Sequence, residues 1–565
     1  MRVLLLNLIE QTETDSTANN HAGEELWYQD AIFYEVYVRA FCDSSGNGHG
    51  DLKGLASKLD YLNDLGIDCL WLMPFYPSPL NDDGYDIADF YNIHPDYGSL
   101  DDFQGLVAEI HARGMRIITD LVLNHTSDQH PWFQAARSSR NSPYRNYYVW
   151  SDTKEKYKEA RIIFVDTEES NWSWDEQAGQ YYWHRFFSSQ PDLNYDNPAV
   201  QDEMIKVMKF WLDLGVDGFR ADAVPYLFER EGTNCENLPE THAYLRRLRR
   251  FMDENYPGRI LLCEANQWPE DLRPYFGDGD EFHVGFHFPI MPRIFMALRK
   301  ENVSPIEWII ERTPVIPDSC QWCIFLRNHD ELTLEMVTEE ERHWMWQEYA
   351  PEPRMRLNLG IRRRLAPLLD NNQKAIELLN SLLFTLPGSP IIYYGDEIGM
   401  GDDIWMADRD GVRTPMQWDT TLNAGFSESD PENLYSQVIE NDTYAPDQVN
   451  VADQRKSSGS LFSNISKMIA VRKQSPVWGR GDFRWASTST EQVAAYFRSY
   501  LGERILVVNN LSSSSQDISI DLHTGSTGMM VDLFTGKKYP VSKRDELRLT
   551  LEPYQYLWLT DGVGL

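Results

Sequence analysis

The chain has 565 residues, which is more than one hydrophobic core supports, so two or three domains are expected. Its 87 acidic and 52 basic side chains give a formal charge of −35. So acidic a surface repels phosphates, which argues against a nucleic-acid partner and suits a neutral substrate.

The distribution of apolar residues argues against membrane insertion or export. No run approaches 18 apolar residues, so no membrane span is predicted. The run at residues 4–9 is too short for a signal peptide and has no small-residue cleavage site, which predicts a cytoplasmic protein. The six cysteines do not form a small-domain disulfide pattern, so buried free thiols are expected, including the Cys320–Cys323 pair.

Strand-like and helical runs alternate along the first part of the chain. Polar residues 11–23 predict a loose arm. Strands are then expected at 32–41, 67–75 and 116–124, with helices at 53–65 and 103–113. The alternation resumes with a helix at 202–214 and further strands at 215–222, 259–266, 281–288, 321–330 and 389–397.

Eight strand–helix units predict a closed (β/α)₈ TIM barrel. We expect its two parts at residues 1–125 and 197–480, the second with a helical and loop insertion at 335–455. Residues 126–196 are rich in Ser, Asn, Tyr, Trp and Pro, which predicts a small inserted domain after strand three. Short runs separated by turn signals over 481–565 predict a C-terminal antiparallel β sandwich. A dinucleotide-binding glycine fingerprint is missing, which disfavours an open doubly wound sheet.

Three apolar runs each break into a carboxylate, at Asp222, Glu264 and Asp330. Strand ends of a (β/α)₈ barrel meet at one catalytic face, so these side chains are expected to converge. A nucleophile, an acid/base and a helper carboxylate are the groups that a retaining glycosidase uses. The sequence therefore predicts glycoside chemistry at this face.

These stretches resemble the four short motifs of the α-amylase family of glycoside hydrolases and transglucosidases. They are Asp120–His125, Gly218–Asp222, Glu264 and Asn328–Asp330, and the resemblance covers residues 27–565. The stretch Gln190–Asn194 is similar to the signature of the subgroup that holds oligo-1,6-glucosidases, sucrose isomerases and trehalose synthases. The stretches Phe75–Tyr85 and Glu229–His242 most closely resemble the trehalose synthases.

The resemblance implies roles for the residues at the barrel mouth. Asp222 would be the nucleophile, Glu264 the acid/base, and Asp330 the residue that binds the 2- and 3-hydroxyls. Arg220, two residues before Asp222, faces the same side of its strand and would keep that carboxylate ionised. Further substrate contacts are implied for His125, His329 and the aromatic platform Tyr85.

A pair of charged residues is expected to close the inner end of the pocket around the glucose 4-hydroxyl. By resemblance the pair is Asp82 with Arg413, and Arg409 is a rival for the same role. Isomerisation also needs a cover that excludes water. Tyr226, Asn266, Glu331, Glu335 and Arg161 are the candidates for acceptor binding or for latching that cover.

Two metal sites are predicted, both structural. The loop from Asp43 to Asp51 alternates oxygen ligands with glycines, which is typical of a site for Ca²⁺ or Mg²⁺. Its candidate ligands are Asp43, Ser45, Asn47, His49 and Asp51. The family implies a second Ca²⁺ site made of Asn124, Asp192, Glu229 and the carbonyls of Tyr226 and Leu227.

The expected activity is an intramolecular transfer of glucose that interconverts maltose and trehalose, with some hydrolysis. The alternative is an α-glucosidase of the oligo-1,6 type, which would share the same carboxylates. No organic cofactor is expected. The resembled group also suggests a homo-oligomer and a separate maltokinase as partners.

Overall fold

The computed structural model describes residues 26–523 and 528–561, so the arm expected at 11–23 lies outside the described residues. Eight parallel strands close into a barrel in the order β1-β14-β10-β9-β8-β7-β3-β2. The predicted closed barrel is therefore confirmed. The strands are β1 (Phe33–Val36), β2 (Cys69–Leu72), β3 (Arg116–Val122), β7 (Gly218–Asp222), β8 (Ile260–Cys263), β9 (Val284–Phe286), β10 (Gln321–Phe325) and β14 (Ser389–Tyr393).

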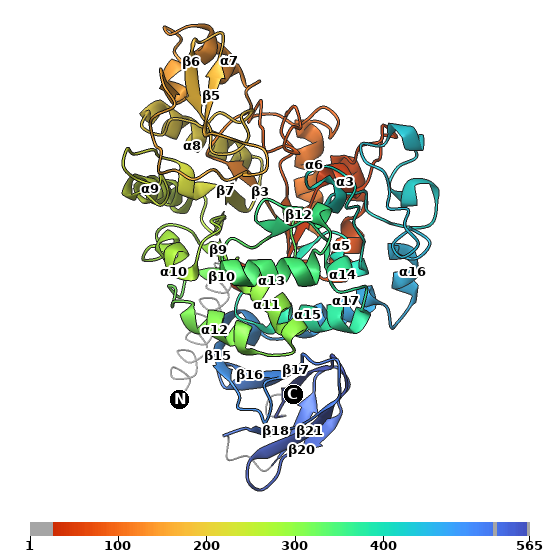
Figure 1. Ribbon diagram of the computed structural model, residues 1–565. Coiled ribbons are helices and arrows are strands. Elements are labelled where there is room, and N and C mark those ends of the chain that lie inside the picture. Colours follow the sequence, from red (N-terminus) through yellow and green to blue (C-terminus); the bar gives the residue numbers. More distant parts are fainter. Residues whose placement is uncertain (1–25, 524–527, 562–565) are drawn as a thin grey trace, which may run out of the picture.

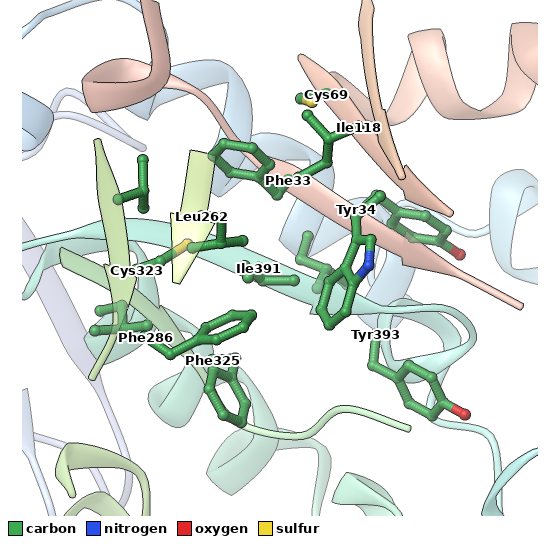
Figure 2. Close-up of a cluster of buried hydrophobic side chains, with 14 of the residues drawn as sticks. Phe33, Tyr34, Cys69, Ile118, Leu262, Phe286, Cys323, Phe325, Ile391 and Tyr393 are labelled. Atoms are coloured by element: carbon green, nitrogen blue, oxygen red, sulfur yellow. The ribbon is translucent and has the colours of Figure 1, made fainter. Parts of the chain in front are cut away.

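The barrel strands are buried on both faces, and this explains their continuous apolar sequences. Inside the barrel, side chains such as Phe33, Leu262 and Phe286 fill the core (Figure 2). Cys69 and Cys323 lie in the same cluster, and all six cysteines are free and buried, as predicted.

Helices cover the outside of the barrel (Figure 1). One of them, α6, begins at Leu100, three residues before the expected start at 103. A capping box between Ser99 and Asp102 sets that start, whereas the prediction followed the apolar period alone. The main helices of this layer are α4 (Leu52–Ser57), α5 (Leu59–Leu65), α6 (Leu100–Ala112), α8 (Pro198–Asp213), α9 (Pro239–Asn255), α11 (Ile290–Lys300), α12 (Ser304–Arg312), α15 (Gln373–Thr385) and α17 (Leu461–Arg472).

The segment between β3 and α8 projects beyond the barrel mouth (Figure 1). It holds α7 (Pro131–Ser138) and an antiparallel sheet in the order β4-β6-β5. The strands are β4 (Trp150–Ser151), β5 (Trp172–Asp175) and β6 (Gln180–Trp183). Trp172 and Trp183 pack with Cys235 from the loop after β7 in a small separate core. This core attaches the inserted segment to the barrel.

The C-terminal part is antiparallel, with one sheet in the order β15-β16-β17-β22-β19-β20 and a second made of β18 and β21. Alternate residues of β16 face opposite sides: Val493 and Ala495 pack toward the small sheet, and Ala494 and Tyr496 toward the barrel core. The strands are β15 (Asp482–Trp485), β16 (Val493–Tyr500), β17 (Glu503–Asn510), β18 (Gln516–Asp521), β19 (Met529–Asp532), β20 (Lys538–Pro540), β21 (Glu546–Leu551) and β22 (Tyr556–Thr560).

Most barrel strands end earlier than predicted. The strand expected at 321–330 ends at Phe325, and the one expected at 389–397 ends at Tyr393. The apolar sequence continues past each strand because the following loops are also buried at the mouth. Among residues 26–523 and 528–561, no helix has both the length and the apolar character needed to cross a bilayer.

Candidate active site

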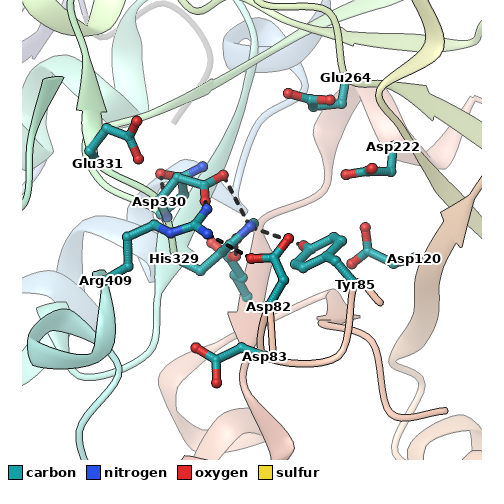
Figure 3. A network of polar contacts seen from close by, with 12 residues as sticks. Asp82, Asp83, Tyr85, Asp120, Asp222, Glu264, His329, Asp330, Glu331 and Arg409 are labelled. Carbon is teal, nitrogen blue, oxygen red and sulfur yellow. Dashed lines mark hydrogen bonds and ion pairs between the residues drawn. The ribbon is translucent and has the colours of Figure 1, made fainter. Parts of the chain in front are cut away.

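The three predicted carboxylates line one pocket at the mouth of the barrel (Figure 3). Asp222 is the last residue of β7, Glu264 directly follows β8, and Asp330 lies on the loop after β10. Parallel strands point their carboxyl ends to the same face, which explains how segments far apart in sequence meet.

Arg220 forms the charged base of this pocket. Its guanidinium bonds Asp222 and lies 2.6 Å from Asp120 Oδ1 and 3.9 Å from Glu264 Oε2. Asp120 on β3 also accepts a hydrogen bond from Trp71 Nε1 at 2.8 Å. Asp120 was not among the residues predicted for the site, although an acidic residue inside a buried apolar strand is a signal of such a network.

Burial and charge give the three carboxylates different acidities. Burial raises the pKa of Glu264 to about 7, despite the nearby Arg220 charge. Burial also raises the pKa of Asp222, to about 6, with Arg220 opposing the shift. Although burial alone would raise it, the charges of His329 and Arg409 hold the pKa of Asp330 well below its usual range. At neutral pH the site therefore offers a proton on Glu264 and charge on the other two.

Tyr85 and His329 form a stacked pair in the pocket wall, with ring centroids 5.3 Å apart and an interplanar angle of 18°. The Tyr85 hydroxyl lies 3.0 Å from His329 Nε2. His125 lines the same pocket, and neither of its ring nitrogens has a hydrogen-bond partner among the described residues. Burial lowers the pKa of His125 to about 3, so it presents a neutral ring to a ligand.

At the inner end of the pocket Asp82 pairs with Arg409, the rival of Arg413 in the sequence prediction, and both residues line the pocket. Arg409 Nη2 lies 2.6 Å from Asp82 Oδ1, and Nη1 lies 2.6 Å from Asp330 Oδ1. Arg413 instead bonds Asp83 at 2.5 Å and donates from Nε to the His329 carbonyl. Arg413 Nη2 also lies 3.3 Å from Asp330 Oδ1, but Arg409 and not Arg413 is among the residues that line the pocket. The geometry therefore favours Arg409 as the partner of Asp82.

The outer part of the pocket holds the predicted acceptor candidates. Tyr226, Asn266 and Glu331 all line it, and Asn266 donates to Thr333 Oγ1 at 3.0 Å. Burial raises the pKa of Glu331. Apolar residues that belong to no motif, and that were therefore not predicted, also line the pocket: Ile163, Phe164, Phe186, Pro225 and Phe288.

Arg161 of the inserted segment connects to the barrel loops over the pocket. It lies 2.9 Å from Glu335 Oε2, 2.9 Å from Glu236 Oε1 and 3.2 Å from the Tyr226 hydroxyl. We call this set the Arg161 latch. The Asp82–Arg409 ion pair thus lies at the inner end of the pocket, and the ion pairs of Arg161 with Glu335 and Glu236 bridge its mouth.

Family models match almost the whole described chain. That of the α-amylase catalytic domain matches residues 35–481, and that of the maltogenic amylase C-terminal domain matches residues 483–558. The chain belongs to the α-amylase family. The predicted resemblance is therefore confirmed.

Members of the α-amylase family with high identity carry related names. The trehalose synthase/amylase of Mycobacterium tuberculosis is 58% identical and covers 95% of this chain and 90% of its own. The trehalose synthase of Pimelobacter sp. strain R48 is 55% identical over 95% of this chain and 97% of its own. A solved structure of the trehalulose synthase from Pseudomonas mesoacidophila MX-45 matches with a TM-score of 0.75 and 29% identity, over 94% of this chain and 99% of that one.

The predicted Asn124 site in this α-amylase family chain has the chemistry of a cation site. Asn124, Asp192 and Glu229 are buried, and each has a side-chain oxygen without a hydrogen-bond partner. Burial raises the pKa of Asp192 to about 8, and burial with the neighbouring Asp192 charge raises that of Glu229 well above its usual value. Two buried carboxylates beside unpaired oxygens are a set that a hard cation satisfies.

The loop from Asp43 to Asp51 fits a cation less well. Asp43 accepts hydrogen bonds from the backbone N–H groups of Ser45, Gly46 and Gly48 and from the Ser427 hydroxyl. Asp51 likewise accepts from Ser44 and Gly54, and the Asn47 oxygen accepts from the backbone N–H of His49. The carboxylates of this loop are satisfied by its own N–H groups, and the described residues contain no cluster of three or more His, Cys, Asp or Glu suited to a metal.

Proposed function

We propose that this chain is an intramolecular transglucosidase that interconverts maltose and α,α-trehalose and releases a small amount of glucose. Relatives named trehalose synthase, 55–58% identical, support the class of reaction. The observation that carries the proposal is a pocket that holds Asp222 and Glu264, ends at the Asp82–Arg409 pair and is bridged by the Arg161 latch. Such a pocket accepts one terminal glucose and favours retention of the leaving sugar.

In the first step Asp222 attacks C1 of the terminal glucose. The bond from C1 to the glycosidic oxygen breaks, and that oxygen takes the proton of Glu264. The products are a β-glucosyl ester on Asp222 and a free glucose. Arg220 keeps Asp222 ionised for the attack, and the raised pKa of Glu264 keeps its proton available.

In the second step the released glucose turns within the pocket. Its anomeric hydroxyl gives a proton to the Glu264 carboxylate and attacks C1, and the ester bond to Asp222 breaks. Two inversions at C1 retain the α configuration and give trehalose. Tyr226, Asn266 and Glu331 would bind the turning glucose, because they line the outer part of the pocket. Water that enters through an open mouth would attack the same ester and give glucose.

We also propose a structural Ca²⁺ held by Asn124, Asp192 and Glu229, with the carbonyls of Tyr226 and Leu227. Bound there, the ion would supply positive charge to buried carboxylates and fix the inserted segment to the loop after β7. It would take no part in bond making. A cation in the Asp43–Asp51 loop remains a prediction from the sequence, as do the homo-oligomer, the maltokinase partner and the cytoplasmic location.

The test is incubation with maltose in the presence of ¹³C-labelled glucose, followed by separation of the products. We expect trehalose as the main product, free of label because the transfer is intramolecular, with glucose as a minor product. Glucose as the sole product would instead identify an α-glucosidase. The Asp222→Asn variant should keep the wild-type Tm and lose turnover, and measurable turnover would exclude Asp222 as the nucleophile.

A further inference from the structure

His329 lies between two carboxylates, one on each side of its ring. Glu35, in β1, bonds Nδ1, and Asp330 Oδ2 lies 3.1 Å from Nε2 (Figure 3 shows the Asp330 side). Glu35 and His329 are both buried, with exposed fractions of 0% and 1%. Glu35 is thus a buried acid with no role in the two steps of glucosyl transfer proposed above.

This geometry determines the charge of the ring. A neutral imidazole has one N–H and one lone pair, so one of its nitrogens would direct a lone pair at a carboxylate. The imidazolium instead donates on both sides, one proton to an oxygen of each acid. Although burial favours the neutral ring, the charges of Asp330 and Glu35 raise the pKa of His329 to about 9.

We propose that Glu35 is a positioning residue for glucosyl transfer: through Nδ1 it holds His329 as an imidazolium whose Nε2–H is directed at Asp330 and the sugar pocket. This inference rests on the proposed function and adds to it a residue that does not line the pocket. Glu35 acts on the sugar only through His329.

Two features of the pocket depend on this arrangement. Asp330 stays ionised beside a positive ring, which suits a residue that stabilises positive charge at C1. Tyr85 stacks on the same ring and hydrogen-bonds Nε2, so the orientation of His329 also sets the platform under the bound glucose. Without the Glu35 charge the ring would deprotonate more readily and lose its donor toward one neighbour.

Among the described residues, Glu35 is the one acid paired with Nδ1. On the Nε2 side, His329 faces Asp330 and the Tyr85 hydroxyl. The His329 charge also lowers the pKa of Asp120 in β3, against the larger effect of burial, which raises it. Arg409 and Arg413 both contact Asp330, and Arg413 also donates to the backbone carbonyl of His329. Behind Glu35 lie Tyr393 and Asp396, whose pKa values are both raised by burial and further by the Glu35 charge.

To separate the titration of His329 from that of the acid/base, the experiment uses the Glu264→Gln variant with α-glucosyl fluoride as the substrate. Fluoride leaves with little help from a general acid, so the burst of fluoride release reports formation of the glucosyl ester alone. The burst rate is measured from pH 5 to 10 for E264Q, for E264Q with E35Q, and for E264Q with E397Q. Glu397 is the matched control, because it is a buried acid whose carboxylate accepts from the hydroxyls of Tyr34 and Tyr61.

In E264Q we expect an alkaline limb near pH 9, from loss of the His329 proton. Removing an opposite charge in contact shifts a pKa by about 1–3 units. The E35Q change should therefore move that limb down by about 1–3 pH units, whereas E397Q should leave it in place. Coincident limbs in E264Q and E264Q/E35Q, or a rate lowered equally at every pH, would overturn the role of Glu35. Absence of a burst at any pH in E264Q would instead count against the glucosyl ester of the proposed function.

A second measurement needs no Glu35 variant. Selective ¹⁵N labelling of histidine, with His329→Gln to assign the signal, gives the protonation state of His329 in the otherwise native chain. We expect both ring nitrogens to carry protons at pH 8. A neutral ring at pH 7 would overturn the inference even if the E35Q chain failed to fold.

Discussion

We expect the Arg161 latch to set how much of the glucosyl group is transferred to glucose and how much to water. Arg161 contacts Glu335 and Glu236, whose side chains are 16% and 9% exposed, while Arg161 itself is 38% exposed. Because Arg161 is more than a third exposed, we take about 0.5–1 kcal/mol for each pair. Loss of both by Arg161→Gln would favour the open mouth by about 1–2 kcal/mol, which is about a 5–30-fold change in its population relative to the closed state.

The assay is the ratio of glucose to trehalose formed from maltose at low conversion. If water enters only through the open mouth, R161Q should raise this ratio by about 5–30-fold. Arg140→Gln is the control, since Arg140 is on the same inserted segment, is 65% exposed and lies 3.9 Å from Asp152. An unchanged ratio in R161Q, with the overall rate either preserved or reduced, would refute the link between the latch and the exclusion of water.

Three further predictions concern the same pocket and its support. The kcat/KM for maltose should rise with pH as Asp222 ionises near its pKa of about 6, and fall at higher pH as Glu264 loses its proton near its pKa of about 7. A kcat/KM that stays constant from pH 5 to 9 would contradict these assignments. Chelation should lower the Tm measured by calorimetry and added Ca²⁺ should restore it, while Asp192→Asn should remove this Ca²⁺ dependence; an equal Ca²⁺ response in the variant would place the ion elsewhere. Arg409→Leu removes charged contacts to Asp82 and Asp330, each worth about 1.5–3 kcal/mol. It should lower kcat/KM for maltose at least about tenfold and raise the kcat/KM for maltotriose relative to that for maltose. An unchanged ratio of the two kcat/KM values would show that this pair does not close the pocket.

The sequence was sufficient to predict the barrel and the carboxylates at its mouth. Continuous apolar runs that alternate with helical periods describe a parallel barrel, because both strand faces are buried. Asp222 and Glu264 come directly at the ends of such runs, so the topology alone brings them to one face. The position of Asp330 was harder to predict from strand topology, since Asp330 lies beyond the end of β10 on a loop.

Pairings between loops were not predictable in the same way. Two arginines, Arg409 and Arg413, lie close together in sequence, and their local patterns do not show which one reaches Asp82. The inner pair joins residues 327 positions apart, and Glu35 meets His329 across 294 positions. Such contacts depend on the paths of several loops at once.

The amino-acid sequence by itself determined the class of fold and the three acids, because strand period and short motifs are local properties of the chain. The ligands expected around Asn124 came from the resemblance to the family. Only the tertiary structure decided that Arg409 pairs with Asp82, that Arg161 pairs with Glu335 and that Glu35 pairs with His329. The physical reason is that an ion pair forms where two side chains meet in space, and the mouth of the barrel collects side chains from every strand and from the inserted segment.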